Sequence, residues 1–311
     1  MKKSVEIRII LFLATVFILS SCSFHGKMAP SESNNSSFSH SGQHLSEGIN
    51  YLNVPNGRIA YQIAGEGEPL MMCIGYNANM DFWDPRLISM LRKHFQVITF
   101  DYRGMGFSSN TDTAFTIATL ANDVELLCRH LGLERIHLLG WSMGGYVAQT
   151  FAIHYPDRVN KLILHATDFG DTVTRNPAPE IACILSDTLA TPAQMIGMMF
   201  PERWLAAQEN PGKLFQHAKS PINKYTIKLQ DNAISKWLMP GGGAVGHLNS
   251  LQMPVLVITG KDDVVVPYEN SIALADSLKI SSLILINNGG HGIMYQYPKL
   301  LAGYILNFLN H

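Results

Sequence analysis

A tight turn between an apolar strand and a helix, with a serine at its tip, most constrains the fold of this chain. The apolar run 136–139 precedes Gly-Trp-Ser-Met-Gly-Gly at 140–145, and an apolar-periodic stretch follows. Such a turn lifts Ser142 out of the sheet in a strained backbone conformation, and the glycines on either side remove side chains that would collide. The N-terminus of the following helix points free N–H groups at the place where an oxyanion would form. The alternative, a glycine-rich loop that holds a serine by chance, is disfavoured by the strand and helix around it.

A serine hydroxyl is a weak nucleophile until a base takes its proton, and that base needs an acid to orient it. Four histidines lie beyond residue 200: His217, His247, His291 and His311. His291 is the best candidate base, because it lies in a glycine-rich turn directly after the apolar run 283–286. A residue in such a turn can reach over the sheet edge without being locked in a helix.

The acid should follow the preceding strand. The run 254–259 is typical of a buried parallel strand, and the adjacent Asp262 and Asp263 come just after it. Asp168, after the strand-like run 161–165, is a third candidate.

Strand and helix patterns alternate along most of the chain. We predict an antiparallel pair at 51–54 and 58–61, and then the following strands: 70–74, 96–101, 135–139, 160–165, 254–259 and 282–287. The predicted helices are 82–93, 114–132, 143–155, 268–278 and 295–309. This alternation indicates an α/β fold, a mostly parallel sheet with helices on both faces and active groups at the carboxyl ends of the strands. Between about 169 and 247 helical patterns continue but no strand returns.

Several motifs in this order resemble those of the serine enzymes of the α/β-hydrolase fold family. The resemblance extends from about Tyr51 to the C-terminus and rests on four segments, namely Asp-Tyr-Arg-Gly-Met-Gly-Phe-Ser at 101–108, Gly140 to Gly145, Gly260 to Pro267, and Gly-His-Gly at 290–292. It implies Ser142 as nucleophile, His291 as base and Asp263, in preference to Asp262, as acid. It also implies that the insertion is a helical cap over the active site. Relatives of this fold that use an aspartate at the turn, haloalkane dehalogenases and epoxide hydrolases, are excluded by the serine.

One segment departs from the family pattern. The family usually has His-Gly after the strand that supplies half of the oxyanion hole, and here Ile74 precedes Gly75. Since the hole uses backbone N–H groups, we expect Tyr76 and Met143 to be the donors. The departure leaves open whether Tyr76 or Asn77 donates.

The first residues indicate export. Lys2 and Lys3 are followed by a short apolar stretch and then by Leu-Ser-Ser-Cys at 19–22. The apolar stretch is too short for a comfortable membrane span and predicts a signal peptide over residues 1–21. The last four residues resemble a bacterial lipobox, which implies a lipid on Cys22. Residues 22–48 then form a flexible tether, and residues 49–311 the hydrolase domain. We expect lipid anchoring to a bacterial membrane, the outer membrane or cell surface more than the inner one, because Ser23 is not the aspartate associated with inner-membrane retention.

Composition excludes other classes of protein. The chain of 311 residues is 47% hydrophobic and 15% charged, and its formal net charge of −1 provides no basic footprint for nucleic acid. No HExxH or P-loop motif is present, and the cysteines other than Cys22 show no metal spacing, so we predict no metal and no cofactor.

The function predicted from these features is hydrolysis of small to medium, mostly apolar carboxylic esters through an acyl-enzyme. The cap sequence is rich in apolar side chains and has no clear basic cluster for a polyanion, which favours such a small-molecule partner. Lactonases, thioesterases, C–C hydrolases, aminopeptidases and perhydrolases use the same triad and stay open. A non-catalytic binding protein on this scaffold is the weaker hypothesis, since it would not need all three groups.

Overall fold

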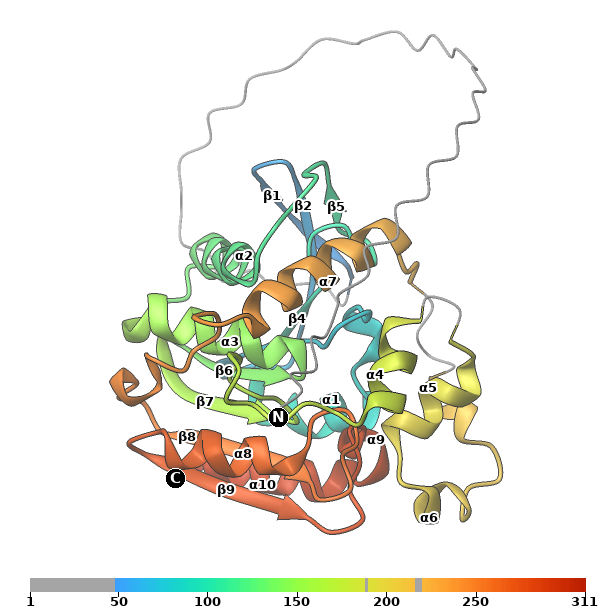
Figure 1. Ribbon diagram of the computed structural model, residues 1–311. Helices are drawn as coiled ribbons and strands as arrows, with labels where there is room; N and C mark the ends of the chain where they lie inside the picture. Colours follow the sequence, from blue (N-terminus) through green and yellow to red (C-terminus); the bar gives the residue numbers. More distant parts are fainter. Residues whose placement is uncertain (1–47, 188–189, 216–219) are drawn as a thin grey trace, which may run out of the picture. The chain divides into compact units, whose positions relative to one another are not determined.

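A mostly parallel sheet forms the centre of the folded part (Figure 1). The computed structural model describes residues 48–187, 190–215 and 220–311, all within one compact unit. The predicted signal peptide and Cys22 lie outside the described residues, as does all but the last residue of the predicted tether. Within the described ranges, no helix has both the length and the apolar character needed to cross a bilayer.

The strands follow the predicted alternation closely. Their order in the sheet is β1-β2-β4-β3-β6-β7-β8-β9, with β5 paired to β2. The bounds are β1 Asn50–Val54, β2 Gly57–Ala64, β3 Glu68–Cys73, β4 Phe95–Phe100, β5 Ser109–Asn110, β6 Ile136–Trp141, β7 Val159–His165, β8 Val255–Gly260 and β9 Ser281–Ile286. The β1–β2, β2–β4 and β2–β5 pairs are antiparallel, and every pair from β4–β3 to β8–β9 is parallel. The predicted fold class is confirmed.

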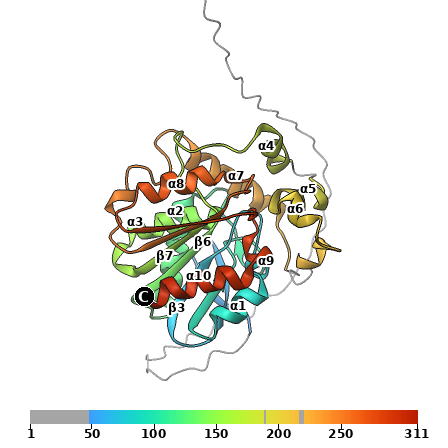
Figure 2. The same ribbon diagram turned by 90° about the horizontal axis from the view of Figure 1, so that it is seen from below.

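Helices cover both faces of the sheet. Figure 2 shows α1 (Pro85–Leu91) and α10 (Pro298–Asn310) on one face, and α2 (Ile117–His130), α3 (Met143–His154) and α8 (Tyr268–Asp276) on the other. Every residue of β6 and β8 is buried, because helices cover these central strands on both sides. Their continuous apolar runs follow from this double covering. The short α9 (Ile293–Gln296) precedes α10.

The chain between β7 and β8, which are neighbours in the sheet, forms the helical insertion. It contains α4 (Pro179–Ser186), α5 (Pro192–Met199), α6 (Glu202–Leu205) and α7 (Lys224–Leu238). Three-residue to five-residue 3₁₀ turns complete the described elements: η1 Met80–Phe82, η2 Pro156–Arg158, η3 Pro211–Phe215 and η4 Leu248–Ser250. Since parallel neighbours end at the same edge, the insertion leaves the sheet at the carboxyl edge, where the candidate site residues also lie.

Candidate active site

Ser142 lies in a strained turn between β6 and α3. Its φ of 55° and ψ of −125° lie in a region that residues with a side chain rarely adopt. The turn is so tight that a Cβ on Gly140 would lie 2.3 Å from the Gly144 carbonyl oxygen, and one on Gly144 would lie 2.0 Å from the Cys73 carbonyl oxygen. The two glycines of the motif are therefore required by close backbone approach, and the turn has the strand–turn–helix form that the sequence predicts.

His291 and Asp263 form a hydrogen-bonded pair. The Nδ1 atom of His291 lies 2.9 Å from Oδ2 of Asp263, and both side chains are buried. The other carboxylate oxygen accepts the backbone N–H groups of Val265 and Val266, each at 2.9 Å. This loop after β8 thus fixes the carboxylate, and a neutral His291 that donates from Nδ1 keeps Nε2 unprotonated and able to accept a proton.

Trp141, the residue before the serine, connects the turn to His291. Its indole N–H donates to the His291 carbonyl oxygen at 3.1 Å, and the two rings pack with their centroids 5.3 Å apart. Within the described residues, the Ser142 hydroxyl forms no hydrogen bond. Catalytic hydrogen bonds often tighten only when substrate binds, so this geometry is compatible with a base beside the nucleophile.

The other two candidate acids have different partners. Asp168 is buried, and its carboxylate accepts the Tyr146 hydroxyl at 2.7 Å and the Gly170 N–H at 2.9 Å. Burial raises the pKa of Asp168 above its usual value. Asp262 has an exposed side chain 3.9 Å from Arg203. Of the three aspartates, Asp263 alone is hydrogen-bonded to His291 in the described part of the chain.

The loop after β3, residues 74–79, packs directly against the serine turn, and we call it the β3 loop. A Cβ on Gly75 would lie 3.3 Å from the Ser142 Cβ and 3.0 Å from the Trp141 ring. The Asn77 N–H donates to Oε1 of Gln230 on α7 at 3.1 Å. By contrast, the N–H groups of Tyr76 and Met143 have no acceptor among the described residues, so these two are available to an oxyanion whereas Asn77 is engaged.

The insertion packs against the turn that carries His291. The Gly292 N–H donates to the Met199 carbonyl oxygen at 2.9 Å. A Cβ on Gly292 would lie 2.5 Å from the Phe200 ring and 3.1 Å from the Met199 methyl group. Apolar side chains of the insertion therefore lie within van der Waals range of the histidine turn. Met239 is another apolar residue of the insertion, but its side chain is 59% exposed.

A second histidine lies beneath the serine turn. The Ser142 N–H donates to the His165 carbonyl oxygen at 3.0 Å, and the His165 Nδ1 lies 3.2 Å from the Ile258 carbonyl oxygen. Complete burial is the main cause that lowers the pKa of His165 to about 4, and the Ile258 carbonyl and the Asp263 carboxylate oppose the change. His165 therefore stays neutral near pH 7. The sequence does not identify His165, because a histidine at the end of an apolar strand carries no motif that would mark its contact with the serine turn.

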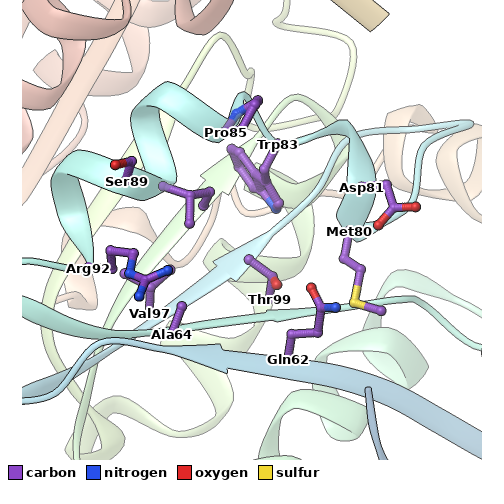
Figure 3. A pocket seen from close by; sticks show the side chains of 11 residues that line it. Gln62, Ala64, Met80, Asp81, Trp83, Pro85, Ser89, Arg92, Val97 and Thr99 are labelled. Carbon is purple, nitrogen blue, oxygen red and sulfur yellow. The ribbon is translucent and has the colours of Figure 1, made fainter. Parts of the chain in front are cut away.

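A pocket of about 290 Å³ lies apart from these residues (Figure 3). Its walls come from β2, β4 and the segment 80–92, and include none of Ser142, Asp263 and His291. Among the described residues, no group of three or more histidine, cysteine or acidic side chains could hold a metal ion.

Comparisons with known proteins match this geometry to one fold family. Residues 68–200 match a family model described as "alpha/beta hydrolase fold", and residues 226–310 match one described as "TAP-like protein". The chain is 28% identical over 256 residues to "Putative carbamate hydrolase RutD" of a Caulobacter species, a match that covers 79% of this chain and 92% of that protein.

Two solved structures are also similar. One is a thermophilic esterase from Thermogutta terrifontis, with 27% identity and a TM-score of 0.69, covering 84% of this chain and 97% of that one. The other is an α/β-hydrolase fold protein from Chitinophaga pinensis, with 27% identity and a TM-score of 0.73, covering 86% of this chain and 99% of that one.

Proposed function

We propose that this chain, which has the α/β-hydrolase fold, hydrolyses carboxylic esters through an acyl-enzyme. The main support is the hydrogen bond between His291 and Asp263 beside the strained Ser142 turn. A neutral imidazole oriented by a buried carboxylate is the arrangement that a serine nucleophile needs. The similarity to an esterase at 27% identity supports the ester class.

In the proposed mechanism, Ser142 Oγ attacks the ester carbonyl carbon while His291 Nε2 takes the hydroxyl proton. The negative charge that forms on the carbonyl oxygen is stabilised by the N–H groups of Tyr76 and Met143. When the carbon–oxygen bond breaks, His291 returns the proton to the leaving alcohol. Water then attacks the acyl-enzyme with His291 again as base, which releases the acid and restores Ser142.

The acyl group is proposed to be small to medium and mostly apolar. Met199 and Phe200 pack against the turn that holds His291 and would give the bound acyl chain an apolar surface. Removal of apolar surface from water contributes about 0.8 kcal/mol for each buried methylene, which favours an acyl chain that fills this space.

Active-site labelling and a substrate panel test the proposal. A fluorophosphonate should label the wild-type protein at Ser142, and p-nitrophenyl esters should be hydrolysed. Ser142→Ala should abolish labelling and lower kcat by about 10⁶-fold while the circular dichroism spectrum stays unchanged. Substantial ester hydrolysis by folded Ser142→Ala would exclude the mechanism. Turnover of a carbamate or a lactone in the same panel, with none of any ester, would move the protein to another class of hydrolase on the same triad.

We also propose that the mature protein is attached to a bacterial membrane by a lipid on Cys22, in the outer membrane or at the cell surface. The support is the lipobox-like sequence 19–22 after a short apolar stretch. Residues 22–48 would then act as the tether between the lipid and the hydrolase domain.

A further inference from the structure

We propose that Gln230, on helix α7 of the insertion, is a positioning residue that holds the β3 loop so that the Tyr76 N–H faces Ser142. This inference rests on the proposed function, in which that N–H stabilises the oxyanion. The insertion would then have two roles in catalysis: it would contact the acyl group, and it would position the β3 loop.

Two consecutive residues of α7 contact two consecutive residues of the β3 loop. Gln230 accepts the Asn77 N–H through Oε1 at 3.1 Å. The next residue, Asp231, acts on the Tyr76 phenol: burial first, and then the neighbouring Asp231 carboxylate, raise the pKa of that phenol well above its usual value. The backbone of the loop is therefore held from α7, and the Tyr76 phenol lies near the same helix.

The residue that Gln230 holds has an unusual backbone conformation. Asn77 has a φ of 52°, in the left-handed region that few residue types other than glycine and asparagine adopt readily. Gln230 is fully buried, and its hydrogen bond removes the Asn77 N–H from competition for the oxyanion. The preceding N–H, that of Tyr76, then remains free next to Gly75, where an added Cβ would lie 3.3 Å from the Ser142 Cβ.

One polar side-chain atom of each residue has no partner in the described part of the chain. Nε2 of Gln230 and Oδ1 of Asn77 are both buried and have no hydrogen-bond partner within the described residues. Among those residues, the hydrogen bond from the Asn77 N–H is therefore the contact that the Gln230 amide makes.

Helix α7 is itself fixed to the hydrolase core at two further points. The Thr226 hydroxyl donates to the Gly104 carbonyl oxygen at 3.0 Å, and the Trp237 ring stacks on Tyr146 of α3 with 5.0 Å between centroids. Gln230 lies between these two anchors, so the helix stays in place when one of them is lost, and the Gln230 side chain itself holds the loop at a defined distance from the serine turn.

Steady-state kinetics with p-nitrophenyl butyrate on the full chain test the assignment. Gln230→Leu removes the acceptor and should lower kcat by about 10- to 100-fold, less than the roughly 10²- to 10³-fold that follows loss of a whole oxyanion donor. KM should change less than about threefold. The inhibition constant of a trifluoromethyl ketone, which forms the tetrahedral oxyanion on Ser142, should rise in parallel with the loss in kcat/KM. Gln230→Glu keeps an acceptor oxygen at the same reach and should recover most of the rate.

Thr226→Val is the matched control, since it removes an anchor of comparable burial on the same helix without touching the β3 loop. It should lower the melting temperature but leave kcat and the ketone constant within about threefold. An unchanged kcat and ketone inhibition constant in folded Gln230→Leu, or an equal loss in Thr226→Val, would overturn the positioning role.

If Gln230→Leu does not fold, Gln230→Asn takes its place, because the shorter side chain retracts the acceptor. It should show the same loss in kcat, and full activity of Gln230→Asn would equally overturn the role. Failure of the proposed function would appear separately, as wild-type protein that fluorophosphonate does not label.

Discussion

At the scale of single residues, the choice among three aspartates shows how sequence and geometry complement each other. The residues alone leave Asp168, Asp262 and Asp263 open, and the family resemblance selects the last. The hydrogen bond from His291 to Asp263 agrees with that selection, and Asp168 instead accepts hydrogen bonds from Tyr146 and Gly170. Each carboxylate oxygen of Asp168 already accepts one of these donors, whereas Oδ1 of Asp263 accepts both backbone N–H groups and leaves Oδ2 for His291.

We therefore expect Asp263→Asn to lower kcat by about 10⁴-fold, because the imidazole is no longer held in the tautomer that accepts the serine proton. Asp262→Asn should stay within a few fold, since that side chain is exposed and lies 3.9 Å from Arg203. Asp168→Asn serves as the buried control and should also stay within about tenfold. Ester hydrolysis by the three purified variants measures this, and a crippled Asp168→Asn with an active Asp263→Asn would reverse the assignment.

His165 makes stability depend on pH. Its folded pKa of about 4 lies below the usual 6.5, so between these values the unfolded chain binds a proton that the folded chain does not. The contribution of neutral His165 to the free energy of unfolding is fully present above pH 6.5. As pH falls toward 4, the free energy of unfolding decreases by at most about 3 kcal/mol.

Urea unfolding of wild type and His165→Gln at about pH 7, 5.5 and 4 isolates this effect from that of the other titrating groups. The free energy of unfolding of the wild type minus that of the variant should decrease steadily from the highest pH to the lowest. A difference that is constant across this range would show that His165 does not titrate between the two states as expected.

At the scale of helices and strands, the local pattern predicted most of what was needed. The predicted 135–139 and 254–259 correspond to β6 and β8, because doubly covered strands have continuous apolar runs. The predicted helix 82–93 is α1, which begins only at Pro85 after the 3₁₀ turn η1, since the Asp84 side chain caps the N-terminus by accepting two backbone N–H groups. The two-residue β5 was not predicted, because so short a segment carries no periodicity.

Contacts between elements that are distant in the chain could not be predicted from the sequence. The glycine and serine positions of the turn could be predicted because each motif is local. The bond between Asn77 and Gln230 joins residues 153 positions apart, and a single glutamine in a helix has no pattern that marks it. The same holds for the packing of Trp141 on His291, which depends on where two loops meet.

The insertion should set the preference for acyl length. Across p-nitrophenyl esters from acetate to laurate, kcat/KM should rise with chain length until the apolar space is full and then fall. Met199→Ala should move the optimum toward longer chains, because the Met199 methyl group lies against Gly292 beside His291. Met239→Ala is the control, since that side chain is 59% exposed. An optimum that shifts equally in both variants, or in neither, would remove Met199 from the acyl-binding surface.

At the scale of the whole molecule, the chain extends beyond its relatives. The Thermogutta esterase matches over 97% of its own length but only 84% of this chain, and the family models begin at residue 68. Some residues of the chain therefore lie outside the region shared with such hydrolases, and the proposed lipid anchor and tether would give them a function. A tether of the predicted composition would let the hydrolase domain move near a membrane without being inserted in it.

Replacing Cys22 tests this directly. A single acyl chain binds a membrane only weakly, and a diacylated and N-acylated cysteine binds it far more firmly, so loss of the thiol should change the distribution of the protein between fractions. In a bacterial host, wild type should sediment with membranes and incorporate labelled palmitate, whereas Cys22→Ser should appear in the soluble or unprocessed pool without label. Cys183→Ser is the matched control, because Cys183 is an exposed cysteine of the folded domain, far from residues 19–22 in the sequence, and should not carry lipid. Membrane association that is the same in Cys22→Ser and wild type, with no label in either, would mean that residues 1–22 direct the chain in some other way than by lipidation.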